Sequence, residues 1–157
     1  MKLDEHLVYK FFVAFSRMEY ALKRAGFAQV ARHGGAEPAW DAFIASIESR
    51  WAELGSRDFT EARDYLLRSP PRRQVLRNST LDWEETPHRA NETEAGFIVR
   101  CVKRIRNNLF HGGKFPSPVG PVAPPERDTQ LLKHSLVIMH FVLKLNERVK
   151  FFFEETV

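Results

Sequence analysis

Apolar residues recur at steps of three and four along most of the chain, the spacing that places side chains on one face of an α-helix. The first such segment runs from Leu3 through Leu22, and Gly26 follows it as a helix stop. A second helix is predicted from Pro38, a residue tolerated in a first helical turn, to Gly55. The residues between these two helices read as a short turn.

The same spacing predicts further helices. Asp58 is placed to cap a third, shorter helix, which Pro70-Pro71 ends. Asn91, with Glu94 three residues later, resembles a capping box that starts a fourth. Gly112-Gly113 end that fourth helix, and the last one extends from about Asp128 towards Phe151.

Two segments lack a helical pattern. Residues 69–91 carry several prolines and many charges and predict an irregular connection. Residues 112–126 are Pro-rich and predict an exposed loop. Because no stretch alternates strictly enough for a strand, we expect an all-α fold, a bundle of four to five helices in a single domain over residues 1–157.

Composition supports a globular chain. Its 157 residues suffice for one domain with one core, and 43% of them are hydrophobic and 28% charged. Cys101 is the single cysteine, which excludes a disulfide framework and a Cys-based zinc site and fits a reducing, cytoplasmic setting. No apolar run approaches the ~20 residues of a membrane span, and residues 1–4 do not open a signal peptide. We therefore expect a soluble chain with no membrane partner.

The net charge is +4, a mild excess that becomes informative where it clusters. Residues 68–78 form one basic cluster, which is typical of a solvated loop. Residues 100–114 form another, inside the fourth predicted helix. At ~100° per residue, its members Arg100, Arg104, Asn107 and His111 fall on one stripe beside the apolar row, while Lys103 and Arg106 point towards the other flank.

This stripe carries residue types suited to phosphate chemistry. His111 lies in the last helical turn, where unpaired carbonyls favour an imidazolium and neighbouring arginines oppose it, which suits proton transfer. Asn107 can orient a hydroxyl or phosphate oxygen, and an arginine can neutralise charge on a phosphorane-like transition state. The alternative is a solvated helix end whose basic residues complement the helix dipole. The spacing alone leaves both interpretations open.

The segment "RNNLFH", Arg106 to His111, resembles the R-x4-6-H motif of the HEPN superfamily, small all-helical nucleotide-binding domains. Asn107 meets the family preference for a polar residue directly after the arginine. "FFVAFSRMEYALK", residues 11–23, is similar to the opening helix of a bacterial HEPN group and includes Glu19 as its acidic residue. The resemblance covers the helical core at both ends and does not extend to residues 27–91.

The resemblance implies a metal-independent endoribonuclease that needs no cofactor and leaves a 2′,3′-cyclic phosphate and a 5′-hydroxyl. It implies a homodimer whose two motifs face one cleft. Such relatives are often toxins paired with an antitoxin of the nucleotidyltransferase type, or act in phage defence. By position, Arg106 would stabilise the phosphate, Asn107 would position it and His111 would be the general acid or base. Residues expected to support the site or bind RNA are Arg104, Arg100, Lys103, Glu19 and Lys114.

Two questions stay open at this stage. Arg106 and His111 are ~140° apart on an ideal helix, whereas Arg104, also compatible with the motif, shares the His111 stripe. We favour Arg106 because Asn107 follows it and keep Arg104 as the second candidate. The chain also fits a catalytically inactive HEPN-like module that binds nucleotide, RNA or a protein partner.

Overall fold

The computed structural model describes residues 4–112 and 125–155. In chain order its elements are α1 (Glu5–Arg24), β1 (Ala28–Val30), β2 (Ala36–Pro38), α2 (Trp40–Ile47), the 3-10 helix η1 (Glu48–Glu53), α3 (Arg57–Arg68), β3 (Arg73–Arg77), β4 (Thr80–Glu84), α4 (Glu94–Phe110), α5 (Pro125–Val142), the 3-10 helix η2 (Leu143–Leu145) and α6 (Glu147–Glu155).

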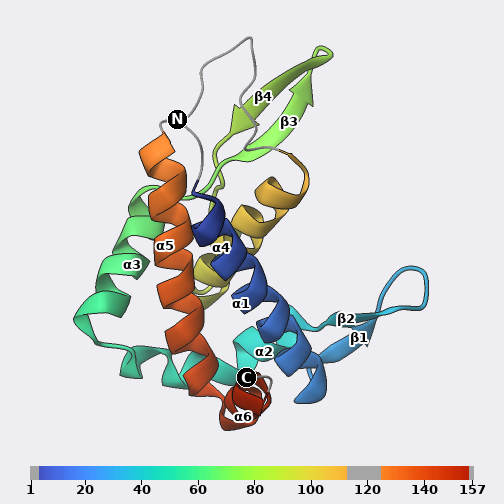
Figure 1. The fold of residues 1–157 in the computed structure, drawn as a ribbon, viewed down its shortest axis with the longest axis vertical. Coiled ribbons are helices and arrows are strands. Elements are labelled where there is room, and N and C mark those ends of the chain that lie inside the picture. Colours follow the sequence, from blue (N-terminus) through green and yellow to red (C-terminus); the bar gives the residue numbers. More distant parts are fainter. Residues whose placement is uncertain (1–3, 113–124, 156–157) are drawn as a thin grey trace.

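The helices pack around α5. Figure 1 shows α1 along one side of α5 and α3 along the other, with α6 crossing below them and α4 behind. The first and last described helices are held together by Arg17 of α1, which donates a hydrogen bond of 2.8 Å to the carbonyl of Phe153 in α6. The guanidinium of Arg17 also lies 4.5 Å from the ring centroid of Phe153. These contacts join the second half of α1 to α6.

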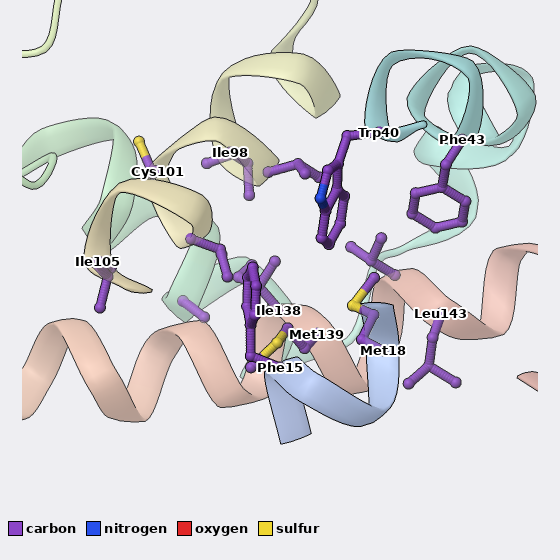
Figure 2. Close-up of a cluster of buried hydrophobic side chains, with 14 of the residues drawn as sticks. Phe15, Met18, Trp40, Phe43, Ile98, Cys101, Ile105, Ile138, Met139 and Leu143 are labelled. Carbon is purple, nitrogen blue, oxygen red and sulfur yellow. The ribbon is translucent and has the colours of Figure 1, made fainter. Parts of the chain in front are cut away.

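A single hydrophobic core lies between these helices (Figure 2). Phe15 and Met18 enter it from α1, Trp40 and Phe43 from α2, and Ile98, Cys101 and Ile105 from α4. Ile138, Met139 and Leu143 close it from α5 and η2. Most members of the apolar rows that the spacing predicted are thus buried or partly buried, while Phe12 is 44% exposed. Burial of this area is the main force that holds the bundle together.

The prediction of a fold without strands was wrong. Two small antiparallel sheets, each of two strands, accompany the helices of the described part. β1 and β2 flank the turn after α1, and Pro38 belongs to β2 rather than to a helical turn. β3 and β4 form a five-residue ladder inside the segment expected to be irregular. Asn78 and Ser79 join them with φ of 48° and 62°, the backbone of a type I′ hairpin turn.

Helix boundaries also differ from the predictions in detail. Ser56, not Asp58, caps α3 by accepting a hydrogen bond of 3.2 Å from the amide of Phe59. Thr93, not Asn91, caps α4 by accepting from the amide of Gly96 at 3.1 Å. The segment predicted as one last helix is broken at η2, and α6 follows as a separate helix. Most of the predicted Pro-rich loop lies outside the described residues, and Pro125 already belongs to α5.

Candidate functional site

The predicted site lies at the carboxyl end of α4. This helix is anchored by its apolar side, on which Phe97, Ile98, Cys101, Val102 and Ile105 are all buried. His111 is its C-cap, and its amide donates to the carbonyl of Asn107 at 3.0 Å. Gly112 follows with φ of 71°, the left-handed backbone that favours glycine after a helix. The helix therefore stops immediately after the motif, with Asn107, Phe110 and His111 exposed at its end.

Arg106 and Asn107 are in direct contact. Nη1 of Arg106 donates a hydrogen bond of 3.0 Å to Oδ1 of Asn107. The guanidinium carbon lies 4.3 Å from the ring centroid of Phe110 and 5.9 Å from that of Phe15. The guanidinium is thus held over an aromatic face, an arrangement that restricts its rotamers. Its other N–H groups make no hydrogen bond within the described part of the chain.

His111 is linked to this pair through Asn107 alone. Asn107 accepts from the Arg106 side chain with its amide oxygen and from the His111 main chain with its carbonyl. The imidazole of His111 is exposed and forms no hydrogen bond or ion pair with any described residue. One chain therefore brings Arg106 and Asn107 together but does not join the imidazole to them.

Aromatic side chains surround the same helix end at the surface. Phe110 is 53% exposed, and its ring centroid lies 5.4 Å from that of Phe12, which is 44% exposed on α1. Tyr9 and Tyr20 are also exposed on α1. Phe12 and Phe110 therefore form an exposed aromatic pair beside Arg106, and two further aromatic side chains of α1 are exposed.

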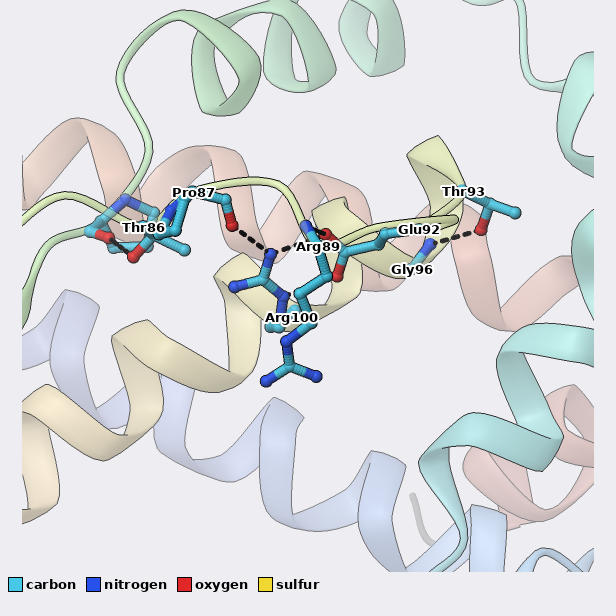
Figure 3. Close-up of polar contacts among 8 residues, drawn as sticks. Thr86, Pro87, Arg89, Glu92, Thr93, Gly96 and Arg100 are labelled. Carbon is cyan, nitrogen blue, oxygen red and sulfur yellow. Dashed lines mark hydrogen bonds and ion pairs between the residues drawn. The ribbon is translucent and has the colours of Figure 1, made fainter.

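The supporting residues are placed differently from one another. Arg100 forms a two-point ion pair with Glu92, in which Nε and Nη2 lie 2.6 Å from the two carboxylate oxygens, and it also donates to the carbonyl of Pro87 at 2.7 Å (Figure 3). Glu92 holds the pKa of the Arg100 guanidinium above its ordinary value through this hydrogen bonding. Arg100 thus fixes the segment before α4.

Lys103 lies on the opposite flank of α4. Its ammonium is 5.6 Å from the ring centroid of Trp40. Burial lowers the pKa of Lys103, while the carboxylates of Asp41 and Glu19 act in the other direction. Glu19 therefore acts on Lys103 and forms no ion pair with Arg104 or Arg106. Lys114 lies outside the described residues.

Arg104 sits in a group of arginines. Burial lowers the pKa of Arg104, and the charges of Arg73, Arg100 and Arg89 lower it further. Its guanidinium has no ion pair or hydrogen bond to any other residue that the structure describes. Arg89, on the segment between β4 and α4, was not among the predicted site residues, because a charged residue in an irregular stretch gives no periodic signal.

Asn108, the neighbour of the predicted site residue Asn107, has a structural role that the spacing of residues along the helix did not predict. Its side chain is buried, and Nδ2 donates to the carbonyl of Arg72 at 2.9 Å. This bond ties α4 to the start of β3. The two adjacent asparagines thus face opposite environments, one in water and one under the hairpin.

A cavity lies elsewhere. It measures about 550 Å³, lies between the end of α3 and the start of α5, and is lined by Tyr65, Arg68, Ser69, Pro70, Arg72, Glu85, Glu126, Arg127 and Gln130. None of the predicted site residues contributes to it.

Over residues 4–112 and 125–155, no three His, Cys, Asp or Glu side chains gather in a way that could hold a metal ion. Among the described helices, none has the length and apolarity required to cross a membrane.

Comparisons with models of known protein families, with curated proteins and with solved structures found no match to this chain. The site must therefore be interpreted from its own chemistry and from the motif in the sequence.

Proposed function

We propose that the protein is a metal-independent endoribonuclease that cleaves RNA by attack of a 2′-hydroxyl on the adjacent phosphate. The observation that carries the proposal is the contact between the side chains of Arg106 and Asn107, one helical turn before His111 at the exposed end of α4. A planar guanidinium, an amide and an imidazole are the groups that such a reaction uses when no metal is bound.

Each group has a defined task in this reaction. The imidazole of one His111 removes the proton from the 2′-hydroxyl while the 2′-oxygen bonds to phosphorus. The bond from phosphorus to the 5′-oxygen then breaks, and an imidazolium donates a proton to that oxygen. The products are a 2′,3′-cyclic phosphate and a 5′-hydroxyl. Arg106 neutralises the negative charge that builds on the phosphate oxygens, and Asn107 orients one of them.

The active form that we propose is a homodimer. One chain holds a single His111, whose imidazole forms no hydrogen bond with Arg106. The reaction, however, needs both a base and an acid. Two copies that meet at the ends of their α4 helices would supply both. The exposed aromatic residues of α1 and α4 offer apolar area for such a contact. We further propose a role as a toxin that an antitoxin protein restrains, or as a component of phage defence.

A second candidate function is a binding module without catalysis. It is favoured by the imidazole of His111, which has no side-chain partner in the described chain. In that case α4 would bind nucleotide, RNA or a protein partner through its basic side, and the motif would not turn over substrate.

The deciding experiment is cleavage of a mixed RNA in EDTA by the wild type, by His111→Ala and by the control His33→Ala, which removes an exposed histidine from the turn between β1 and β2. We expect cleavage with cyclic-phosphate ends by the wild type and by His33→Ala, and none by His111→Ala. If none of the three proteins cleaves any of several RNAs at high protein concentration, the nuclease proposal is wrong and the binding module stands. Equal cleavage by all three would remove His111 from the mechanism.

A further inference from the structure

Arg89 and Arg104 approach the same region from two different elements. Arg104 projects from α4, and Arg89 lies on the segment that connects β4 to α4. In Figure 3 the Arg89 side chain extends past the guanidinium of Arg100, and no contact to its own guanidinium is drawn. Glu92 brings the two elements together, because it accepts from the main-chain amide of Arg89 and from the guanidinium of Arg100, and Arg104 lies one helical turn after Arg100. The charge of Arg89 also lowers the pKa of Arg104.

The nearest carboxylates are already engaged. Glu92 uses both oxygens on Arg100, and one of them also accepts from the main-chain amide of Arg89 at 3.0 Å. Arg73, the fourth arginine of the group, is ion-paired with Glu84 of β4. Glu84 in turn contacts Arg77 at 3.1 Å. The two carboxylates thus bind the arginines that brace the hairpin and the loop. Arg89 shares the charge of Glu92 with Arg100, and neither Arg89 nor Arg104 forms an ion pair of its own within the described residues.

Such an arrangement is unfavourable unless an anion completes it. Like charges that lie close together repel, and the partial burial of Arg104 strengthens the repulsion because less water screens it. Arginine has a planar fork of donors that matches the oxygens of a phosphate, and two arginines can share one phosphate. The ion pair of Arg100 with Glu92 holds the backbone that carries Arg89. An anion bound between Arg89 and Arg104 would therefore be held by two such forks and would offset the repulsion between them.

The position of this group along α4 relates it to the predicted site. Arg104 lies one turn before Asn107 and about two turns, ~10 Å, before His111, on the same stripe of the helix. A strand of RNA whose scissile phosphate meets Arg106 and His111 would thus carry a neighbouring phosphate past Arg104.

We propose that Arg89 and Arg104 form a second phosphate subsite, which binds a backbone phosphate of the RNA next to the one that is cleaved. This inference rests on the proposed function for the identity of the polymer as RNA. It adds a binding residue, Arg89, from outside the helix that bears the motif. It also assigns Arg104 to RNA binding and leaves Arg106 as the catalytic arginine.

The test uses an oligonucleotide with 2′-O-methyl groups, which binds but cannot be cleaved because its nucleophile is blocked. Its affinity is measured by fluorescence anisotropy between about 50 and 200 mM salt for the wild type, Arg89→Gln, Arg104→Gln and the control Arg148→Gln, which removes an exposed arginine of α6. We expect Arg89→Gln and Arg104→Gln each to weaken binding at the lowest salt and to reduce the slope of log K against log salt by about 0.7, the value for one contact to a single strand. Arg148→Gln should leave the slope unchanged.

The outcomes separate this inference from the proposed function. An unchanged slope in Arg89→Gln overturns the subsite, and so does the absence of binding by the wild type at low salt. Cleavage of unmodified RNA would leave the nuclease proposal intact in either case. Conversely, a reduced slope without any cleavage supports the subsite and overturns the nuclease. Because Arg89 is exposed, we expect Arg89→Gln to fold. This variant therefore still tests the subsite if Arg104→Gln does not fold.

Discussion

The side chain of Asn108 donates a hydrogen bond of 2.9 Å to the carbonyl of Arg72, and so fastens the middle of the chain to the last turns of α4. Its neighbour Asn107 is exposed and accepts instead from Arg106. Two identical residues, adjacent in sequence, thus lie in different environments, one buried under the hairpin and the other exposed.

We predict that Asn108→Ala destabilises the fold. The substitution removes a buried donor and leaves the Arg72 carbonyl without this partner, which should lower the free energy of unfolding by about 1–3 kcal/mol. Denaturation in urea measures this change. Asn107→Ala is the matched control and should alter the free energy of unfolding by less than about 0.5 kcal/mol while it reduces RNA cleavage. The opposite ranking of the two variants in stability would contradict the positions described.

We predict that substitution by lysine affects the rate of cleavage differently at Arg106 and at Arg104. Arg106→Lys keeps a positive charge but loses the planar fork that binds Asn107 and lies over Phe110. We expect a loss of about 10²–10³-fold in the rate of cleavage, comparable to removal of one donor to a transition-state anion. Arg104→Lys should retain most of the rate at saturating RNA. Single-turnover kinetics distinguish the two, and a larger loss for Arg104→Lys would reverse the assignment of the catalytic arginine.

The ion pair of Glu92 with Arg100 predicts a dependence of stability on pH. Hydrogen bonding by Arg100 holds the pKa of Glu92 below its ordinary value of about 4.5. A carboxyl group whose pKa is lower in the folded state stabilises the fold above the ordinary value, and this stabilisation is lost as the pH falls through the folded value. Glu92→Gln should therefore unfold more easily than the wild type at pH 7, by about 1–3 kcal/mol, and the difference should vanish at low pH.

Glu85→Gln is the control for this pair. Glu85 accepts from Arg72 at 2.8 Å, but both side chains are largely exposed, and an exposed pair contributes less than about 1 kcal/mol. Urea denaturation at several pH values from 3 to about 7 compares the two variants. A difference between wild type and Glu92→Gln that persists unchanged to pH 3 would show that the carboxylate charge is not its source.

Cys101 is predicted to be inert in the folded protein. Burial raises the pKa of its thiol to about 12, so the reactive thiolate is almost absent at neutral pH, and its side chain is fully covered by the core. A thiol reagent such as Ellman's reagent should therefore react only as fast as the chain opens, and immediately in urea. Rapid reaction with the folded chain at pH 8 would contradict the burial of this residue.

The helices were predictable because their apolar rows follow a helical period over long stretches, as on α1 and α4. The hairpin of β3 and β4 was missed because its strands do not alternate between apolar and polar residues. Its ladder instead places arginines and carboxylates beside one another, as Arg73 is beside Glu84. The Asn78-Ser79 turn was a local signal, since asparagine tolerates the left-handed backbone of such a turn.

The candidate site was predictable only where its residues share one helix. The spacing placed Asn107 and His111 on one stripe, and the motif resemblance added Arg106. The structure adds that the side chains of Arg106 and Asn107 are in contact. Helical geometry alone does not tell which of two neighbouring asparagines lies beneath a hairpin, so the role of Asn108 depends on the tertiary fold. The ion pair of Glu92 with Arg100 likewise depends on the tertiary fold, because the path of the loop before α4 brings the two side chains together.

The position of α1 has a consequence for the nascent chain. Its apolar side is covered mainly by α5 and α6, whose residues follow it by more than a hundred positions. While the chain emerges from the ribosome, the side of α1 that α5 and α6 cover therefore lacks these neighbours until most of the sequence has been translated, although Phe15 can meet Trp40 earlier. Throughout that interval α1 presents an uncovered apolar stripe, on which a chaperone or another unfinished copy of the chain can act before the bundle closes.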